Sequence, residues 1–111
     1  MRDWATEQFK QAGFRIHQGK PKGESPLLPL LRLLESFGFK ISEDKGGTHK
    51  VAYHPDLEGW ILSPIGIITI PIKHSGSGNK PMAKEHYVIL CLKAIDHLHQ
   101  KGVIGHEQAE Y

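Results

Sequence analysis

The first regular pattern of hydrophobic positions lies between Ser25 and Gly38. The apolar residues that recur at the spacing of one helix face are Leu27, Leu30, Leu31, Leu34 and Phe37. Ser25 followed by Pro26 is typical of an N-cap and a first helical position, and Gly38 is typical of a residue just past a helix end. Leu28 and Leu33 widen the apolar surface, so we expect a core helix that is covered on two sides.

A two-residue alternation of apolar and polar positions follows and predicts strands. The alternating segments are 39–42, 50–54 and 67–73, with turns predicted at 43–47 and 55–59. Ile68, Ile70 and Ile72 share one face of the last strand, where Pro71 indicates an edge position or a strand end. Residues 60–62 are predicted to form a brief extra strand before Pro64.

A second long helix is predicted over residues 83–101, ending at Gly102. Its apolar stripe consists of Tyr87, Leu90, Cys91, Ala94, Ile95 and Leu98. At the other end of the chain we expect a short helix over residues 3–12 and a flexible linker over 18–24. The predicted organisation is an N-terminal extension at 1–24, one domain at 25–104 and a polar tail at 105–111.

The order of elements in that domain is helix, three strands, helix, and it predicts an α+β fold. Short turns between successive strands favour a three-stranded antiparallel meander. Two amphipathic helices then cover one face of the sheet and leave the other for solvent or a ligand. This αβββα arrangement is that of double-stranded-RNA-binding domains.

Composition sets further limits on the function. The chain has 111 residues, of which 39% are hydrophobic and 23% charged, as expected for one globular domain. The net charge of +2 does not indicate a nucleic-acid partner, but lysines and arginines concentrate in two acid-free runs, 8–23 and 59–84. These runs could form a local positive surface, or their lysines could be solvated loop residues.

Cys91 is the single cysteine, which excludes an intrachain disulfide and fits a reducing cytosol. The first ten residues lack the apolar core of a signal peptide, and no apolar run approaches the roughly 20 residues that span a bilayer. We therefore expect a cytoplasmic protein that does not interact with membranes.

His49 is the strongest candidate for chemistry among the eight histidines. It follows Gly46, Gly47 and Thr48 at the mouth of a strand, where backbone N–H groups can meet a phosphate. A neutral imidazole there could take a proton from a ribose 2′-OH or give one to the leaving 5′-oxygen near neutral pH. The alternative is a turn histidine that is hydrogen-bonded to the backbone.

Other candidates are weaker. His54 points opposite to His49 on simple alternation, whereas His74, beside Lys73, could supply a second acid or base. The alternative, which we favour for each, is a surface histidine. The loop 75–80 could bind phosphate through its backbone or could be a flexible connection.

Metal and thiol chemistry are not expected. His97 and His99 do not share a helix face, and no cluster has zinc-ligand spacing, so we expect neither a metal nor another cofactor. Cys91 lies on the apolar stripe and is interpreted as a core residue, because a nucleophilic thiolate needs an exposed electropositive site.

The sequence resembles the HicA family, small RNA-cleaving toxins of bacterial toxin–antitoxin pairs, over roughly residues 27–104. The matching pieces are the segment Leu30–Phe39, the Gly-Thr-His-Lys-Val motif at 47–51, His54-Pro55 and the Ile-Thr-Ile-Pro-Ile strand at 68–72. Departures are the N-terminal extension, a longer segment at 57–66 and a last helix that carries Glu85 and Asp96.

The resemblance implies a double-stranded-RNA-binding type of fold, metal-free cleavage of mRNA with His49 as the catalytic histidine, and a HicB-like antitoxin as partner. Together with the residue pattern, it gives His49 and His74 as predicted catalytic residues. The predicted RNA-binding residues are Lys45, Gly47, Thr48, Lys50, Lys73 and Lys80. The alternative is a non-catalytic module of the same fold that binds RNA or a protein.

Overall fold

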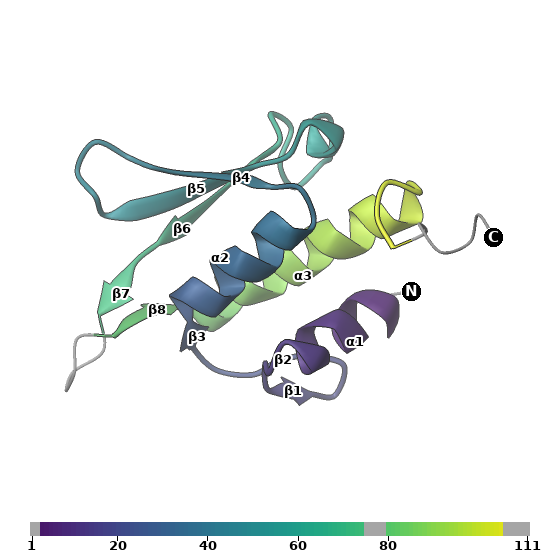
Figure 1. The fold of residues 1–111 in the computed structure, drawn as a ribbon, viewed down its shortest axis with the longest axis horizontal. Helices are drawn as coiled ribbons and strands as arrows, with labels where there is room; N and C mark the ends of the chain where they lie inside the picture. Colours follow the sequence, from purple (N-terminus) through teal and green to yellow (C-terminus); the bar gives the residue numbers. More distant parts are fainter. Residues whose placement is uncertain (1–2, 75–79, 106–111) are drawn as a thin grey trace.

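Three α-helices and three small antiparallel sheets make up residues 3–74 and 80–105, which are the residues that this computed structural model describes (Figure 1). The helices are α1 (Asp3–Gln11), α2 (Leu27–Ser36) and α3 (Glu85–Gln100), with a short 3₁₀ helix η1 (Pro55–Leu57). The strands are β1 (Ile16–His17), β2 (Lys20–Pro21), β3 (Ser25–Pro26), β4 (Lys40–Glu43), β5 (His49–Tyr53), β6 (Ile67–Pro71), β7 (Lys73–His74) and β8 (Pro81–Ala83). The predicted α+β class is confirmed.

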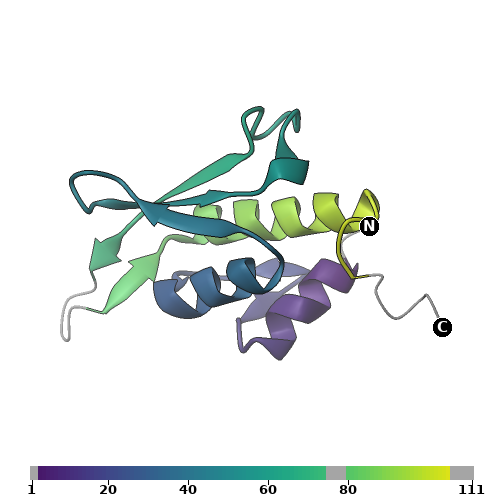
Figure 2. The same ribbon diagram turned by 45° about the horizontal axis from the view of Figure 1, so that its top comes forward.

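The sheet β4–β5–β6 is antiparallel and follows the predicted order along the chain. Ile41, Ala52 and Ile68 lie opposite one another across the three strands, and Ala52 and Ile68 are buried. Figures 1 and 2 show α2 and α3 side by side against one face of this sheet. The buried alternate positions therefore face the helices, whereas His49 and Val51 belong to the other face of β5.

Helix α2 is built from the predicted leucine stripe, of which Leu27, Leu30, Leu31 and Leu34 are buried. It ends as predicted, because Gly38 adopts a φ of 95° and donates its N–H to the carbonyl of Glu35 at 3.0 Å. The predicted N-cap is wrong: Ser25 belongs to β3 and pairs with Ala83, and no side chain caps the helix.

Leu28, one of the two residues that widen the apolar surface of α2, is 49% exposed, whereas Leu33 is partly buried against the core. The second long helix closely follows its prediction. Helix α3 buries Cys91, which confirms the assignment of this residue to the core, and the burial raises the pKa of its thiol to about 12.

No helix within residues 3–74 and 80–105 is long and apolar enough to span a bilayer.

The N-terminal segment packs below the two central helices (Figures 1 and 2). Phe9 and Phe14 are buried in the same core as the α2 and α3 residues, with their ring centroids 5.2 Å apart. Trp4 stacks on His99 of α3 with a centroid distance of 4.3 Å. Helix α1 therefore adds a layer to the core on the side away from the β4–β5–β6 sheet.

The predicted strand 67–73 is interrupted after Pro71, which has no N–H to continue a ladder. The N–H of Ile72 still donates to the carbonyl of Thr48 at 3.0 Å, and β7 then leaves to pair with β8. Strands β3, β8 and β7 form a second small sheet, which the sequence pattern did not predict. Most of the loop predicted at 75–80 lies outside the described residues.

The predicted strand at 60–62 is wrong. Within residues 58–66 the chain forms turns with one isolated bridge between Trp60 and Ser63. This segment carries three strongly exposed hydrophobic residues, namely Ile61, Leu62 and Ile65. Gly66 ends it with a φ of 80° before β6 begins.

Candidate active site

The candidate site is the tip of the β4–β5 hairpin, between Asp44 and His49. The N–H of Asp44 donates to the carbonyl of His49 at 3.2 Å, and the N–H of Gly47 donates to the carbonyl of Asp44 at 3.1 Å. Gly47 has a φ of 71°, a conformation that favours glycine. The glycine turn thus brings Asp44 back to the start of β5.

The Asp44 carboxylate holds both residues that follow this turn. Oδ1 accepts hydrogen bonds from the backbone N–H groups of Thr48 at 2.9 Å and His49 at 3.2 Å. Oδ2 accepts from Thr48 Oγ1 at 3.1 Å and lies 3.1 Å from His49 Nδ1. Desolvation raises the carboxyl pKa, but these bonds from His49 and Thr48 outweigh it and lower the pKa of Asp44 from 3.8 to about 2.

The same contacts fix the tautomer of His49. Asp44 is ionised at neutral pH, so its oxygens only accept hydrogen bonds, and the neighbouring Nδ1 must carry a proton. Thr48 Oγ1, which donates its own proton to Asp44, lies 2.8 Å from Nδ1 and can accept from the same N–H. In neutral His49 the unprotonated nitrogen is therefore Nε2.

The Nε2 atom of His49 has no hydrogen-bond partner among the described residues, and the side chain is 39% exposed. Such a nitrogen can take a proton from a hydroxyl group that approaches from solvent. The carboxylate behind Nδ1 holds the ring in place and stabilises the imidazolium that proton transfer creates. An oriented imidazole at an exposed hairpin tip is an arrangement suited to general base chemistry.

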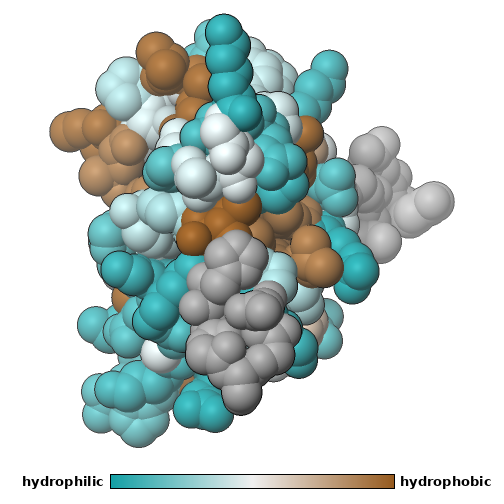
Figure 3. Space-filling model, turned by 90° about the vertical axis from the view of Figure 1, so that its left-hand side faces the viewer, coloured by the Kyte–Doolittle hydropathy of each residue, from teal (hydrophilic) through white to brown (hydrophobic). Residues whose placement is uncertain are grey.

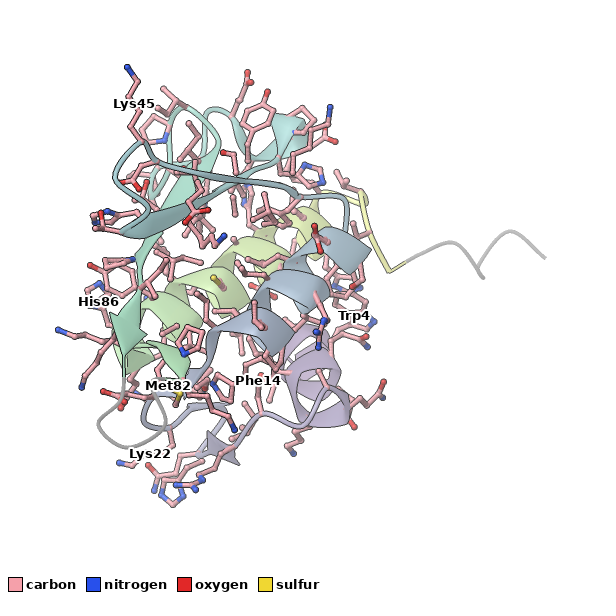
Figure 4. The ribbon with its side chains drawn as sticks, turned by 60° about the vertical axis from the view of Figure 1, so that its left-hand side comes forward. Trp4, Phe14, Lys22, Lys45, Met82 and His86 are labelled. Atoms are coloured by element: carbon pink, nitrogen blue, oxygen red, sulfur yellow. The ribbon has the colours of Figure 1, made fainter. Side chains whose placement is uncertain are left out.

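The other predicted residues on this hairpin have different environments. Lys45 is exposed and projects from the hairpin tip (Figure 4). Lys50 pairs with Glu43 across the ladder, with Nζ 3.3 Å from Oε1, and follows His49 on the strand, so it belongs to the opposite face. Lys45 is the better placed of the two lysines to meet a ligand of His49.

The structure brings the start of β7 close to the hairpin, because Ile72 is bonded to Thr48 and Lys73 is the next residue. Lys73 forms an ion pair with Glu24, so its charge is partly compensated. The side chain of His74 lies outside the described structure, and its role as second acid or base stays a prediction. Lys80 is exposed just before β8.

His54 is not a surface histidine, contrary to one expectation. It is only 5% exposed, its Nδ1 accepts the N–H of Asp56 at 3.1 Å, and its Nε2 lies 3.2 Å from the carbonyl of Phe37. Its ring also packs edge-on against Phe39 with centroids 5.1 Å apart. His54 therefore caps η1 and joins the sheet to the end of α2.

The histidines of α3 pack against aromatic rings. His86 stacks on Tyr87 and His97 on Trp60, with centroid distances of 4.0 and 5.3 Å. Among the described residues, no group of three or more His, Cys, Asp or Glu side chains is placed to hold a metal ion.

Asp44 is the residue of the candidate site that the sequence pattern did not predict, because that pattern gives it only a place in the turn at 43–47. The available signal was an aspartate four residues before Thr48 and five before His49, on the other side of a Gly-Gly pair. An aspartate that precedes such a turn is well suited to accept backbone N–H groups beyond it.

Comparison with protein-family models, with curated proteins and with solved structures found no match to this chain. The support for a function is therefore the arrangement of Asp44, Thr48 and His49.

Proposed function

We propose that this protein is a metal-independent endoribonuclease of the HicA type that cleaves mRNA, with His49 as its general base. The single observation that carries the proposal is the Asp44–His49 pair, in which Nδ1 lies 3.1 Å from the carboxylate and the His49 side chain is 39% exposed. This geometry meets the requirement for proton abstraction from a ribose 2′-OH near neutral pH.

The proposed reaction is an internal transfer at phosphorus. His49 Nε2 takes the proton of the 2′-OH as O2′ attacks the adjacent phosphorus, and the bond from phosphorus to O5′ breaks. The products are a 2′,3′-cyclic phosphate and a 5′-hydroxyl, whose oxygen takes a proton from a general acid. His74 at β7 is the candidate for that acid, and we propose the exposed Lys45 as the cation that stabilises the phosphate, because the N–H of Gly47 already donates to the carbonyl of Asp44.

The fold supports the same proposal. In its support, α2, the sheet β4–β5–β6 and α3 follow one another along the chain, with η1, β7 and β8 as additional short elements and with both helices on one sheet face (Figure 2). We propose that this part of the chain is a variant of the double-stranded-RNA-binding type of fold. The other face and the hairpin tip stay open for RNA. A cytoplasmic enzyme of this kind needs restraint, so we propose a HicB-like antitoxin that covers His49 with carboxylates.

The test is cleavage of a fluorescently labelled mRNA fragment by the purified protein in the presence of EDTA. The wild-type chain should cleave, His49→Ala should not, and His17→Ala, a change at an exposed histidine of β1, should cleave normally. Circular dichroism checks that all three proteins fold. Cleavage by His49→Ala at the wild-type rate would overturn His49 as the general base. No cleavage by the wild type would leave a non-catalytic binding module as the better account.

A further inference from the structure

Two shallow hollows lie on either side of Pro26 and Pro29, where β3 leads into α2. The second hollow has a volume of about 250 Å³. The residues that line it are Pro26, Leu28, Pro29, Arg32, Lys80 and Pro81, which we call the proline groove.

The lining of the proline groove combines an apolar surface with positive charge. Three proline rings and Leu28, which is 49% exposed, supply flat apolar area, and Arg32 and Lys80 are its charged residues. No carboxylate lines it. Its volume is below the roughly 300–1,000 Å³ of small-molecule pockets, so it suits one planar group rather than an enclosed metabolite.

The ends of the two acid-free runs lie beside the groove. The pairing of β3 with β8 puts Ser25 opposite Ala83, which brings the end of the run 8–23 next to the end of the run 59–84. The acidic residues next to this junction are already engaged: Glu24 pairs with Lys73, and Glu85 accepts the N–H of Gly23 at 3.0 Å.

The groove lies at the same end of the molecule as the His49 hairpin. Strands β3, β7 and β8 and the tip of the β4–β5 hairpin all gather at the left-hand end of Figure 1. Figure 3, which looks onto this end, shows hydrophobic residues between areas of hydrophilic ones. In Figure 4, Met82 of β8 and Lys45 of the hairpin mark the two borders of this surface.

We propose that the proline groove binds a base of single-stranded RNA, with Arg32 and Lys80 contacting the phosphates beside it. This inference rests on the proposed function, because the bound segment is the flank of the strand that His49 cleaves. Single strands bind without sequence preference through apolar contact with their bases, most often from aromatic side chains, and through cations at their phosphates. In this groove proline rings and Leu28 provide the apolar contact in place of aromatic side chains. A groove without carboxylates matches a polyanion better than a neutral peptide.

The experiment measures binding separately from cleavage. Fluorescence anisotropy with a labelled single-stranded RNA is recorded in a His49→Ala background, which prevents cleavage. At 0.1 M salt, a phosphate contact with a single-strand slope of about 0.7 is worth about fivefold in affinity. We expect Arg32→Glu and Lys80→Glu each to weaken binding at least about fivefold and to lower the salt slope by about 0.7.

The matched control is Lys93→Glu, a change of the same charge at an exposed position of α3 outside the groove, which should change affinity less than twofold. Leu28→Ser should weaken binding with no change in salt slope, because it removes apolar contact only. Equal affinities for Arg32→Glu, Lys80→Glu and Lys93→Glu would overturn the proposal.

The two proposals can fail separately. If neither the wild type nor His49→Ala cleaves RNA, the catalytic proposal fails, whereas the anisotropy result still decides the groove. If the groove variants bind RNA normally but lose an acidic protein partner, the groove is a protein interface and the RNA proposal is overturned.

Discussion

Asp44→Asn is the change that isolates the orientation of His49 from its presence. In the native protein the backbone N–H groups of Thr48 and His49 donate to Asp44 Oδ1 at 2.9 and 3.2 Å, and the amide oxygen of Asn can still accept both bonds. The amide nitrogen replaces Oδ2 and can only donate a hydrogen bond. Facing Nδ1 at 3.1 Å, it favours the tautomer whose proton sits on Nε2, which can no longer accept a proton.

The size of the loss follows from the exposure of the pair. General base catalysis contributes about 10²–10⁴ in rate, and the same change in a buried Ser-His-Asp triad costs about 10⁴. In this protein the side chains of Asp44 and His49 are 36% and 39% exposed. In addition, Thr48 Oγ1 lies 2.8 Å from His49 Nδ1 and offers its N–H a second acceptor. We therefore expect kcat/KM for RNA cleavage to fall about 10²-fold, less than for His49→Ala.

The assay is the rate of cleavage of a short labelled RNA under single-turnover conditions in EDTA. Thr48→Val is the companion variant, because it keeps the backbone bond to Asp44 and removes only the hydroxyl. It should lose less activity than Asp44→Asn. Full activity of a folded Asp44→Asn protein would refute the claim that Asp44 sets the tautomer of His49.

Three further predictions concern stability and are measured by urea unfolding. The pKa of Asp44 is about 2 in the folded protein against 3.8 ordinarily, so the stability that its ionised carboxylate contributes is present above about pH 4 and is lost as pH falls toward 2. Asp44→Asn should therefore lose less stability than the wild type over this pH range. Parallel curves of unfolding free energy against pH for the two proteins would contradict the lowered pKa of Asp44. His54→Ala should cost about 2–4 kcal/mol, because it leaves the N–H of Asp56 unpaired and a cavity beside Phe39; a cost below about 0.5 kcal/mol would contradict its structural role. Gly66→Ala should cost at least about 1 kcal/mol more than Gly59→Ala. Both glycines have positive φ, but only at Gly66 would a Cβ lie 2.8 Å from the carbonyl oxygen of His54. Equal costs would show that the structure relaxes to relieve this contact.

The parts of the fold that sequence predicted are those with long periodic patterns. The leucine stripe of α2, the alternation in β5 and β6 and the apolar stripe of α3 each extend over enough residues to define a period. Gly38 and Gly102, with φ of 95° and 81°, mark the two helix ends where glycine was read as a stop.

The second sheet could not be predicted in this way. Strands β3, β7 and β8 have two or three residues each, and two of them contain proline, so no alternation distinguishes them from loops. Their pairing depends on contacts between residues 25–26 and 81–83, far apart in the sequence. The same pairing is why Ser25 is a strand residue rather than the N-cap of α2.

The candidate site was predicted in part. The position of His49 followed from the glycine turn and the strand that it opens. Asp44 was missed because its role depends on how that turn closes, which the residue types alone do not determine. His54 was misjudged because the burial of a strand-end histidine depends on α2, whose Phe37 carbonyl it contacts.

The most direct test of the central claim is the chemistry of the cleaved ends, because a His49 base acts on the 2′-OH. The RNA that the wild-type protein cleaves is prepared again with a single 2′-deoxy nucleotide at the cleaved position and treated with the protein in EDTA. The account predicts a 2′,3′-cyclic phosphate and a 5′-hydroxyl from the all-ribose RNA and no cleavage at the deoxy position. Cleavage there, or products that carry a 5′-phosphate, would contradict it.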